Sequence, residues 1–74
     1  MYYEYDAENE VLIRIPDDDL PKIFYRCEGC WRSFGSSDDL YMRAIYIGQG
    51  CWERLEAITE EKGRKILEEW GCGK

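Results

Sequence analysis

The sequence predicts a small α+β fold, an antiparallel sheet with one main C-terminal helix. Three observations predict it. The first fifteen residues alternate apolar and polar side chains as strands do. A strand–turn–strand pattern surrounds the CEGC segment. Residues 59–71 carry a helix cap, early acids and an apolar stripe. With 74 residues, the chain is expected to form a single domain over 1–74.

The first element is a predicted β-hairpin in YYEYDAENEVLIRIP, residues 2–16. Tyrosines alternate with acids on its first strand, and the turn falls at residues 6–9. Val11, Ile13 and Ile15 alternate on the returning strand. The prolines on either side of DDDL make that stretch a loop, because proline cannot continue a strand ladder.

The middle of the chain is predicted to hold three further strands. KIFYR (22–26) leads into CEGC and WRSF (31–34) leaves it, which is the shape of a zinc knuckle. SSDD (36–39) has the hydroxyl and acids of a helix start. The following LYMRAIYI is nevertheless rich in β-branched and aromatic residues. We therefore expect a strand from Tyr41 to Ile47 and a turn at 48–50.

The last predicted element is a helix from Glu60 to Trp70, capped by Thr59 and ended by Gly71. Gly63 costs about 1 kcal/mol inside a helix but leaves room for close packing. The stripe of Ile66, Leu67 and Trp70 is expected to face the sheet. The sheet residues expected opposite it are Val11, Ile13, Ile15, Leu55 and Ile58.

The four cysteines, Cys27, Cys30, Cys51 and Cys72, are predicted to bind one structural Zn²⁺. A chain this short builds only a marginal core, so a staple is expected. A single helix over 52–70 would separate Cys51 from Cys72 by about 30 Å. A strand over 52–58 followed by the returning helix would bring them together. Free reduced thiols and two disulfides remain the alternatives.

Composition excludes several classes of function. The chain has no histidine, four thiolates would close a zinc site, and no phosphate-binding glycine pattern occurs, so we expect no enzyme. The longest run without a charged residue spans nine positions, 44–52, so no membrane span is expected. The opening MYYEYDAENE lacks the features of a signal peptide, which predicts a cytoplasmic protein.

The net charge of −6 arises within the first twenty residues, which contain seven acidic residues and one basic residue, Arg14. An acidic surface of this kind repels nucleic acid and attracts basic proteins. The alternatives are acids that serve solubility, a nucleic-acid-binding zinc domain using residues 62–65, and an accessory subunit with aromatic anchors. The candidate partner-binding residues are Glu4, Asp6, Glu8, Glu10, Asp17, Asp18 and Asp19.

In its general character, and not in any shared motif, the chain resembles the small zinc-bearing anti-CRISPR proteins of phages that inhibit Cas9-type nucleases. The resemblance covers the whole chain and consists of its single-domain length, the acidic YYEYDAENE and IPDDDLP, and the four cysteines. Anti-CRISPR families share no motif, so no functional residue is carried over. The resemblance implies a non-catalytic inhibitor in the host cytoplasm that blocks target DNA loading, without binding nucleic acid itself.

Overall fold

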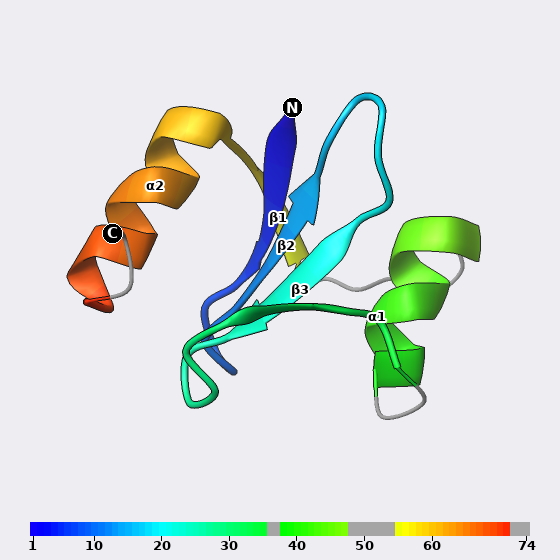
Figure 1. Ribbon diagram of the computed structural model, residues 1–74, viewed down its shortest axis with the longest axis horizontal. Coiled ribbons are helices and arrows are strands. Elements are labelled where there is room, and N and C mark those ends of the chain that lie inside the picture. Colours follow the sequence, from blue (N-terminus) through cyan, green and yellow to red (C-terminus); the bar gives the residue numbers. More distant parts are fainter. Residues whose placement is uncertain (36–37, 48–54, 72–74) are drawn as a thin grey trace.

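A computed structural model describes residues 1–35, 38–47 and 55–71 of the chain. Its centre is a five-stranded antiparallel sheet with the strand order β4-β3-β2-β1-β5. Figure 1 shows the sheet with helix α2 on one side and helix α1 on the other. The α+β class and the C-terminal helix are therefore confirmed. No helix in these ranges combines the length and the apolar character needed to cross a membrane.

The predicted N-terminal hairpin is confirmed as β1 (Tyr2–Asp6) and β2 (Val11–Ile15). Its turn is stabilised by the Asp6 carboxylate, which accepts hydrogen bonds from the backbone and side-chain nitrogens of Asn9 at 3.2 and 2.9 Å. An aspartate that bonds the backbone ahead of it in this way favours a turn. Strand β5 (Leu55–Thr59) pairs with the outer side of β1.

The second hairpin, β3 (Lys22–Tyr25) and β4 (Trp31–Ser33), encloses the CEGC turn as predicted. The strand predicted over Tyr41–Ile47 is wrong. Those residues belong to a helix, formed by α1 (Asp39–Met42) and a π-helical segment, η2 (Arg43–Ile47). Packing overrides strand propensity here, because Tyr41 and Ile45 lie one helical turn apart and both contact the sheet. The turn predicted at 48–50 lies outside the described residues.

Helix α2 (Glu60–Glu69) begins at Glu60 as predicted and ends one residue earlier than predicted, with Trp70 as its C-cap. The Thr59 hydroxyl accepts the Lys62 amide at 3.2 Å, and the Gly71 amide donates to the Glu68 carbonyl at 2.9 Å. Gly63 is buried against the ring of Tyr3. A Cβ at this position would lie 2.8 Å from Tyr3 Cγ and closer still to Cδ2, so only glycine allows this approach of helix and sheet.

The core has two layers, one on each face of the sheet. Ile66 and Leu67 of α2 pack on one face with the sheet residues Tyr3, Leu12, Phe24 and Ile58. The helix α1–η2 covers the other face. The expected partners of α2 are therefore wrong except Ile58, because the other four lie beneath α1–η2: Val11, Ile13, Ile15 and Leu55. Strand β2 is buried on both faces, so its alternation does not indicate which side faces α2.

Candidate functional site

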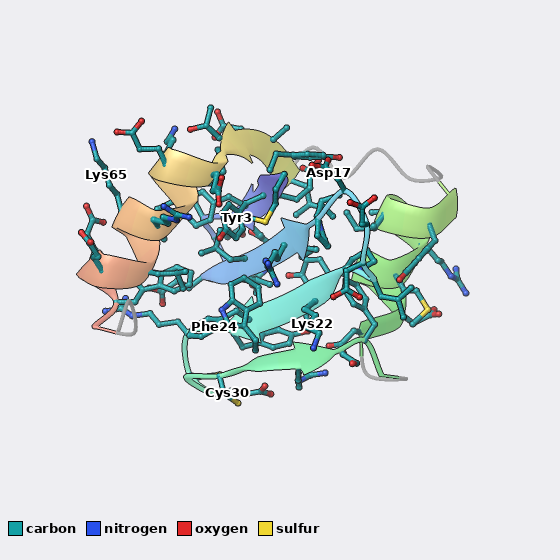
Figure 2. All side chains as sticks on the ribbon, turned by 45° about the horizontal axis from the view of Figure 1, so that its top comes forward. Tyr3, Asp17, Lys22, Phe24, Cys30 and Lys65 are labelled. Carbon is teal, nitrogen blue, oxygen red and sulfur yellow. The ribbon has the colours of Figure 1, made fainter. Side chains whose placement is uncertain are left out.

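The CEGC turn places Cys27 and Cys30 at the tip of the β3–β4 hairpin, where both are exposed free thiols. Figure 2 shows Cys30 at the edge of the molecule, at the end of the sheet opposite Asp17. The turn is closed by the amides of Glu28 and Gly29, which both donate to the Tyr25 carbonyl at 3.0 Å. Gly29 adopts a positive φ of 72°.

The CEGC turn has the cysteine spacing of half a zinc site. Two thiols with this spacing on a tight turn are a common half-site for zinc. A zinc knuckle would direct its amides at sulfur, whereas here two of them are directed at a carbonyl oxygen. Cys51 and Cys72 lie outside the described residues, and the described ranges contain no cluster of three or more metal ligands. Two of the four predicted ligands are thus placed.

The chain reversal behind the zinc prediction is present in the described residues. Leu55, the first residue of β5, pairs with Asp6, and Asp6 pairs in turn with Val11. This row of residues extends to Tyr25, just before CEGC. Trp70 returns to the same end of the sheet, where its ring lies 6.1 Å from that of Phe24. Both Leu55 and Trp70 therefore lie at the hairpin end of the sheet, the end that carries the CEGC turn.

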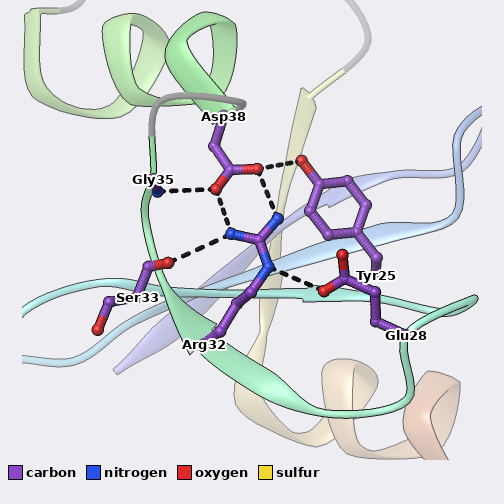
Figure 3. Close-up of polar contacts among 6 residues, drawn as sticks. All are labelled: Tyr25, Glu28, Arg32, Ser33, Gly35 and Asp38. Carbon is purple, nitrogen blue, oxygen red and sulfur yellow. Dashed lines mark hydrogen bonds and ion pairs between the residues drawn. The ribbon is translucent and has the colours of Figure 1, made fainter.

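A polar network centred on Asp38 joins the start of α1 to the second hairpin (Figure 3). The Arg32 guanidinium contacts both oxygens of Asp38, with Nη2 to Oδ1 at 2.9 Å. The Tyr25 hydroxyl and the Gly35 amide also donate to this carboxylate. Arg32 in turn bonds Glu28 inside the CEGC turn at 2.8 Å. The network therefore connects the cysteine turn with helix α1–η2.

The charges of this network are fixed by its hydrogen bonds. Donation from Arg32, opposed by burial and helped by Tyr25, lowers the pKa of Asp38 to about 2. Burial and the hydrogen bond to Asp38 raise the pKa of Tyr25. The hydrogen bonds that Arg32 donates to Asp38 and Glu28 raise the pKa of Arg32. At neutral pH the three groups are an anion, a neutral phenol and a cation, which is an arrangement that holds structure.

A second buried carboxylate, Asp6, lies on the same face of the sheet. It is 0% exposed and accepts the Tyr41 hydroxyl at 2.8 Å in addition to the two bonds from Asn9. Burial alone would raise the pKa of Asp6, but these hydrogen bonds outweigh it and lower the pKa. Every buried side-chain nitrogen and oxygen in the described ranges has a partner. Both carboxylates therefore act as anchors for helix α1–η2.

The candidate partner-binding acids do not form one face. Asp6 is buried and bound internally, so its assignment as a contact residue is wrong. Glu4 is half-buried beside Ile13, and burial raises its pKa. The remaining acids divide between the two ends of the sheet. Glu8 and Glu10 lie in the β1–β2 turn, and Asp17, Asp18 and Asp19 lie in the β2–β3 loop at the opposite end.

Sequence reasoning missed the Asp38 and Asp6 networks. The sequence indicates Asp38 only as an acid at a helix start, and its pairing with Arg32 crosses the segment 33–37. The signal that was present is the helical spacing of Asp39 with Arg43, which form an ion pair at 3.1 Å. This spacing favours a helix over a strand. Nothing in the sequence pairs Tyr41 with Asp6, which lies 35 residues earlier.

Comparisons with known proteins do not assign the chain to a family. No protein-family model, curated protein or solved structure matches it. The functional argument therefore depends on its own residues.

Proposed function

We propose that the chain is a non-catalytic inhibitor that binds a basic surface of another protein and occupies it. The observation that supports this proposal is the β2–β3 loop, in which Asp17, Asp18 and Asp19 are consecutive and exposed. Asp17 holds the N-terminal amine at 3.2 Å, and Asp19 accepts the Leu20 amide at 2.7 Å. In the described part of the chain, Asp18 has no ion-pair partner. The loop thus offers negative charge to a partner.

Most arginines in the described ranges are neutralised by ion pairs and do not offset the charge of the β2–β3 loop. Four of the five arginines in the described ranges are paired with acids, which limits the positive charge they present. These pairs are Arg26 with Glu10, Arg32 with Glu28 and Asp38, Arg43 with Asp39, and Arg64 with Glu60. Glu10 is consequently a weaker candidate contact than the loop aspartates.

The candidate target is a Cas9-type nuclease in the cytoplasm of a phage-infected cell. The resemblance to anti-CRISPR proteins suggests it, and electrostatics agrees with it. Such nucleases hold their guide–target duplex and displaced strand in positively charged channels. An acidic domain placed in a channel of this kind would compete with target DNA for the same cations. Inhibition would be stoichiometric and would weaken as salt rises.

Zinc remains part of the proposal as a structural cofactor. Cys27 and Cys30 would supply two thiolate ligands at the hairpin tip, with Cys51 and Cys72 as the other two. Bound zinc would fix the tip of the hairpin and would take no part in chemistry. Because Arg32 bonds both Glu28 in the turn and Asp38, a fixed hairpin tip would also stabilise the Asp38 network.

The experiment is a DNA-binding and cleavage assay with guide-loaded Cas9-type nuclease and its target duplex, with the protein in molar excess. We expect both activities to fall, and the effect to shrink between low and physiological salt. The triple variant Asp17→Asn, Asp18→Asn, Asp19→Asn should lose most of the inhibition. If the nuclease binds and cleaves its target DNA undiminished, it is refuted as the target. Affinity capture would then test whether the chain binds another protein with a basic surface.

A matched control removes the same number of charges elsewhere. Glu56, Glu68 and Glu69 are exposed acids of β5 and α2. The variant Glu56→Gln, Glu68→Gln, Glu69→Gln has the same net charge as the loop variant and should still inhibit. Equal losses from both variants would mean that net charge, not the β2–β3 loop, governs binding.

A further inference from the structure

An apolar hollow lies where the β2–β3 loop meets helix α1–η2. Its volume is about 380 Å³. In Figure 1 the loop runs beside this helix, on the side of the sheet away from α2. The loop, the segment after β4 and the helix all contribute to its wall: Leu20, Pro21, Ser33, Phe34, Met42 and Tyr46. Its size is near the lower end of the range for ligand pockets, so it suits one large side chain.

The wall of the hollow contains apolar side chains that face water. Three large apolar residues are exposed in the described ranges, namely Tyr2, Leu20 and Tyr46. Two of these three line the hollow, with Leu20 71% and Tyr46 52% exposed. Phe34 packs edge to face on Tyr46 at 6.1 Å, which gives the hollow an aromatic wall. Exposed apolar residues grouped around one hollow, rather than scattered singly, support an interaction site here.

The charge around the hollow is predominantly negative. Asp17, Asp18 and Asp19 directly precede Leu20 in the loop, and all three are exposed. On the helix side, Arg43 is paired with Asp39 at 3.1 Å. Lys22 follows Pro21, but strand alternation places it with Arg14 on the α2 side of the sheet. A ligand in the hollow would therefore meet the loop aspartates, of which Asp17 alone has an ion-pair partner in the described residues, the N-terminal amine.

We propose that this hollow docks a segment of a partner protein in which a large apolar or aromatic side chain is flanked by lysine or arginine. The apolar side chain would fill the hollow, and the flanking cations would pair with Asp17, Asp18 and Asp19. This inference rests on the proposed function and names the contact surface for it. Aromatic anchors buried in pockets are usual centres of binding energy at interfaces.

The test uses synthetic peptides and the full chain. The probe is the peptide Arg-Lys-Trp-Lys-Arg, and the comparison peptides are Arg-Lys-Ser-Lys-Arg and Glu-Glu-Trp-Glu-Glu. Binding is followed by chemical-shift changes in ¹⁵N-labelled protein up to millimolar peptide. We expect the Trp-containing basic peptide to shift the amides of residues 18–20 and 42–46. The other two peptides should bind at least about tenfold more weakly, since each lacks one of the two contributions.

Variants separate this surface from the rest of the molecule. Leu20→Ser removes an exposed apolar side chain that lines the hollow. It should weaken binding of the Trp-containing basic peptide by about tenfold and leave the melting temperature of the protein unchanged. Tyr2→Ser removes an exposed aromatic elsewhere and should leave binding intact. No amide shifts at residues 18–20 and 42–46, or equal binding by wild type and Leu20→Ser, would overturn the inference.

The nuclease assay keeps the two proposals distinguishable. If Leu20→Ser inhibits as well as wild type while the triple aspartate variant does not, the hollow is refuted and the acidic inhibitor stands. If the peptide binds in the hollow but the nuclease is not inhibited, the docking surface stands and the nuclease is the wrong partner.

Discussion

The Tyr41 hydroxyl donates a hydrogen bond to the Asp6 carboxylate at 2.8 Å, across 35 positions of sequence. It joins helix α1–η2 to strand β1, and the carboxylate it meets is fully buried. The same carboxylate orders the β1–β2 turn through Asn9. One side chain therefore closes the first hairpin and fixes the helix that lines the proposed docking hollow.

Tyr41→Phe should destabilise the fold by about 1.5–3 kcal/mol, because it removes a hydrogen bond to a buried charged group. Denaturant unfolding measures this loss, and hydrogen exchange should show earlier opening of residues 39–47. Tyr46→Phe is the matched control, since Tyr46 is half-exposed, and it should change stability by less than about 0.5 kcal/mol. Equal effects of the two substitutions would contradict the anchoring role of Asp6.

Acid should weaken the fold through Asp38. Its pKa is about 2 in the folded protein and ordinarily 3.8, so the folded state binds this proton less readily than the unfolded state. The stabilisation is therefore complete above about pH 4 and is lost as pH falls towards 2. The lowered pKa of Asp6 acts in the same direction. Urea unfolding measured between pH 2 and 6 should show this loss.

Three variants test whether Asp38 causes the loss of stability in acid. Asp38→Asn should flatten the pH dependence and lower stability at pH 6, and Tyr25→Phe, which keeps the Arg32 pair, should flatten it partly. Asp18→Asn makes the same change on an exposed loop and should retain the wild-type profile. A wild-type profile in both network variants would show that Asp38 is not responsible.

The sequence predicted correctly those elements whose signals lie within a short stretch of the chain. The first hairpin, the CEGC turn and helix α2 each carry their signal within about fifteen residues, as alternation, turn chemistry or caps. The strand predicted over residues 41–47 was wrong because Tyr41 and Ile45 face a sheet surface formed by distant strands, and burial there favours the same residues in a helix or a strand. The helical spacing of Asp39 with Arg43 was the better guide.

The candidate site was predicted less completely than the fold. The sequence identifies CEGC as a pair of thiols and the β2–β3 loop as acidic, because both features consist of adjacent residues. It does not show that Asp6 points inward, since strand alternation alone cannot tell which face of β1 a second helix covers. The hollow is formed by three separate segments, so it depends on tertiary contacts throughout.

Gly63→Ala should destabilise the protein by about 1–3 kcal/mol, although alanine is the better helix former by about 1 kcal/mol. The new methyl group would overlap the Tyr3 ring, which is buried and stacks on Trp31 at 6.0 Å. Combining it with Tyr3→Leu should recover part of the loss, which a double-mutant cycle measures. A stabilised Gly63→Ala protein would mean that α2 lies farther from β1.

Metal content and thiol chemistry test the role of the four cysteines. If Cys27, Cys30, Cys51 and Cys72 bind zinc, protein purified without chelator should contain one zinc per chain, and chelator should lower its melting temperature. Cys27→Ser should lower it as sharply or prevent folding, since metal binding and folding are coupled in such sites. Ser33→Ala, on the neighbouring strand, is the control and should keep its zinc.

The alternatives give different results in the same measurements. Disulfides would leave no titratable thiols in the unfolded chain before reduction, and reductant rather than chelator would lower the melting temperature. Free thiols would give four reactive groups per unfolded chain, no zinc, and no response to either reagent. Zinc near zero with unchanged stability in chelator would therefore reject the zinc site. If reductant also had no effect, the fold would depend on its two apolar layers and the Asp6 and Asp38 networks.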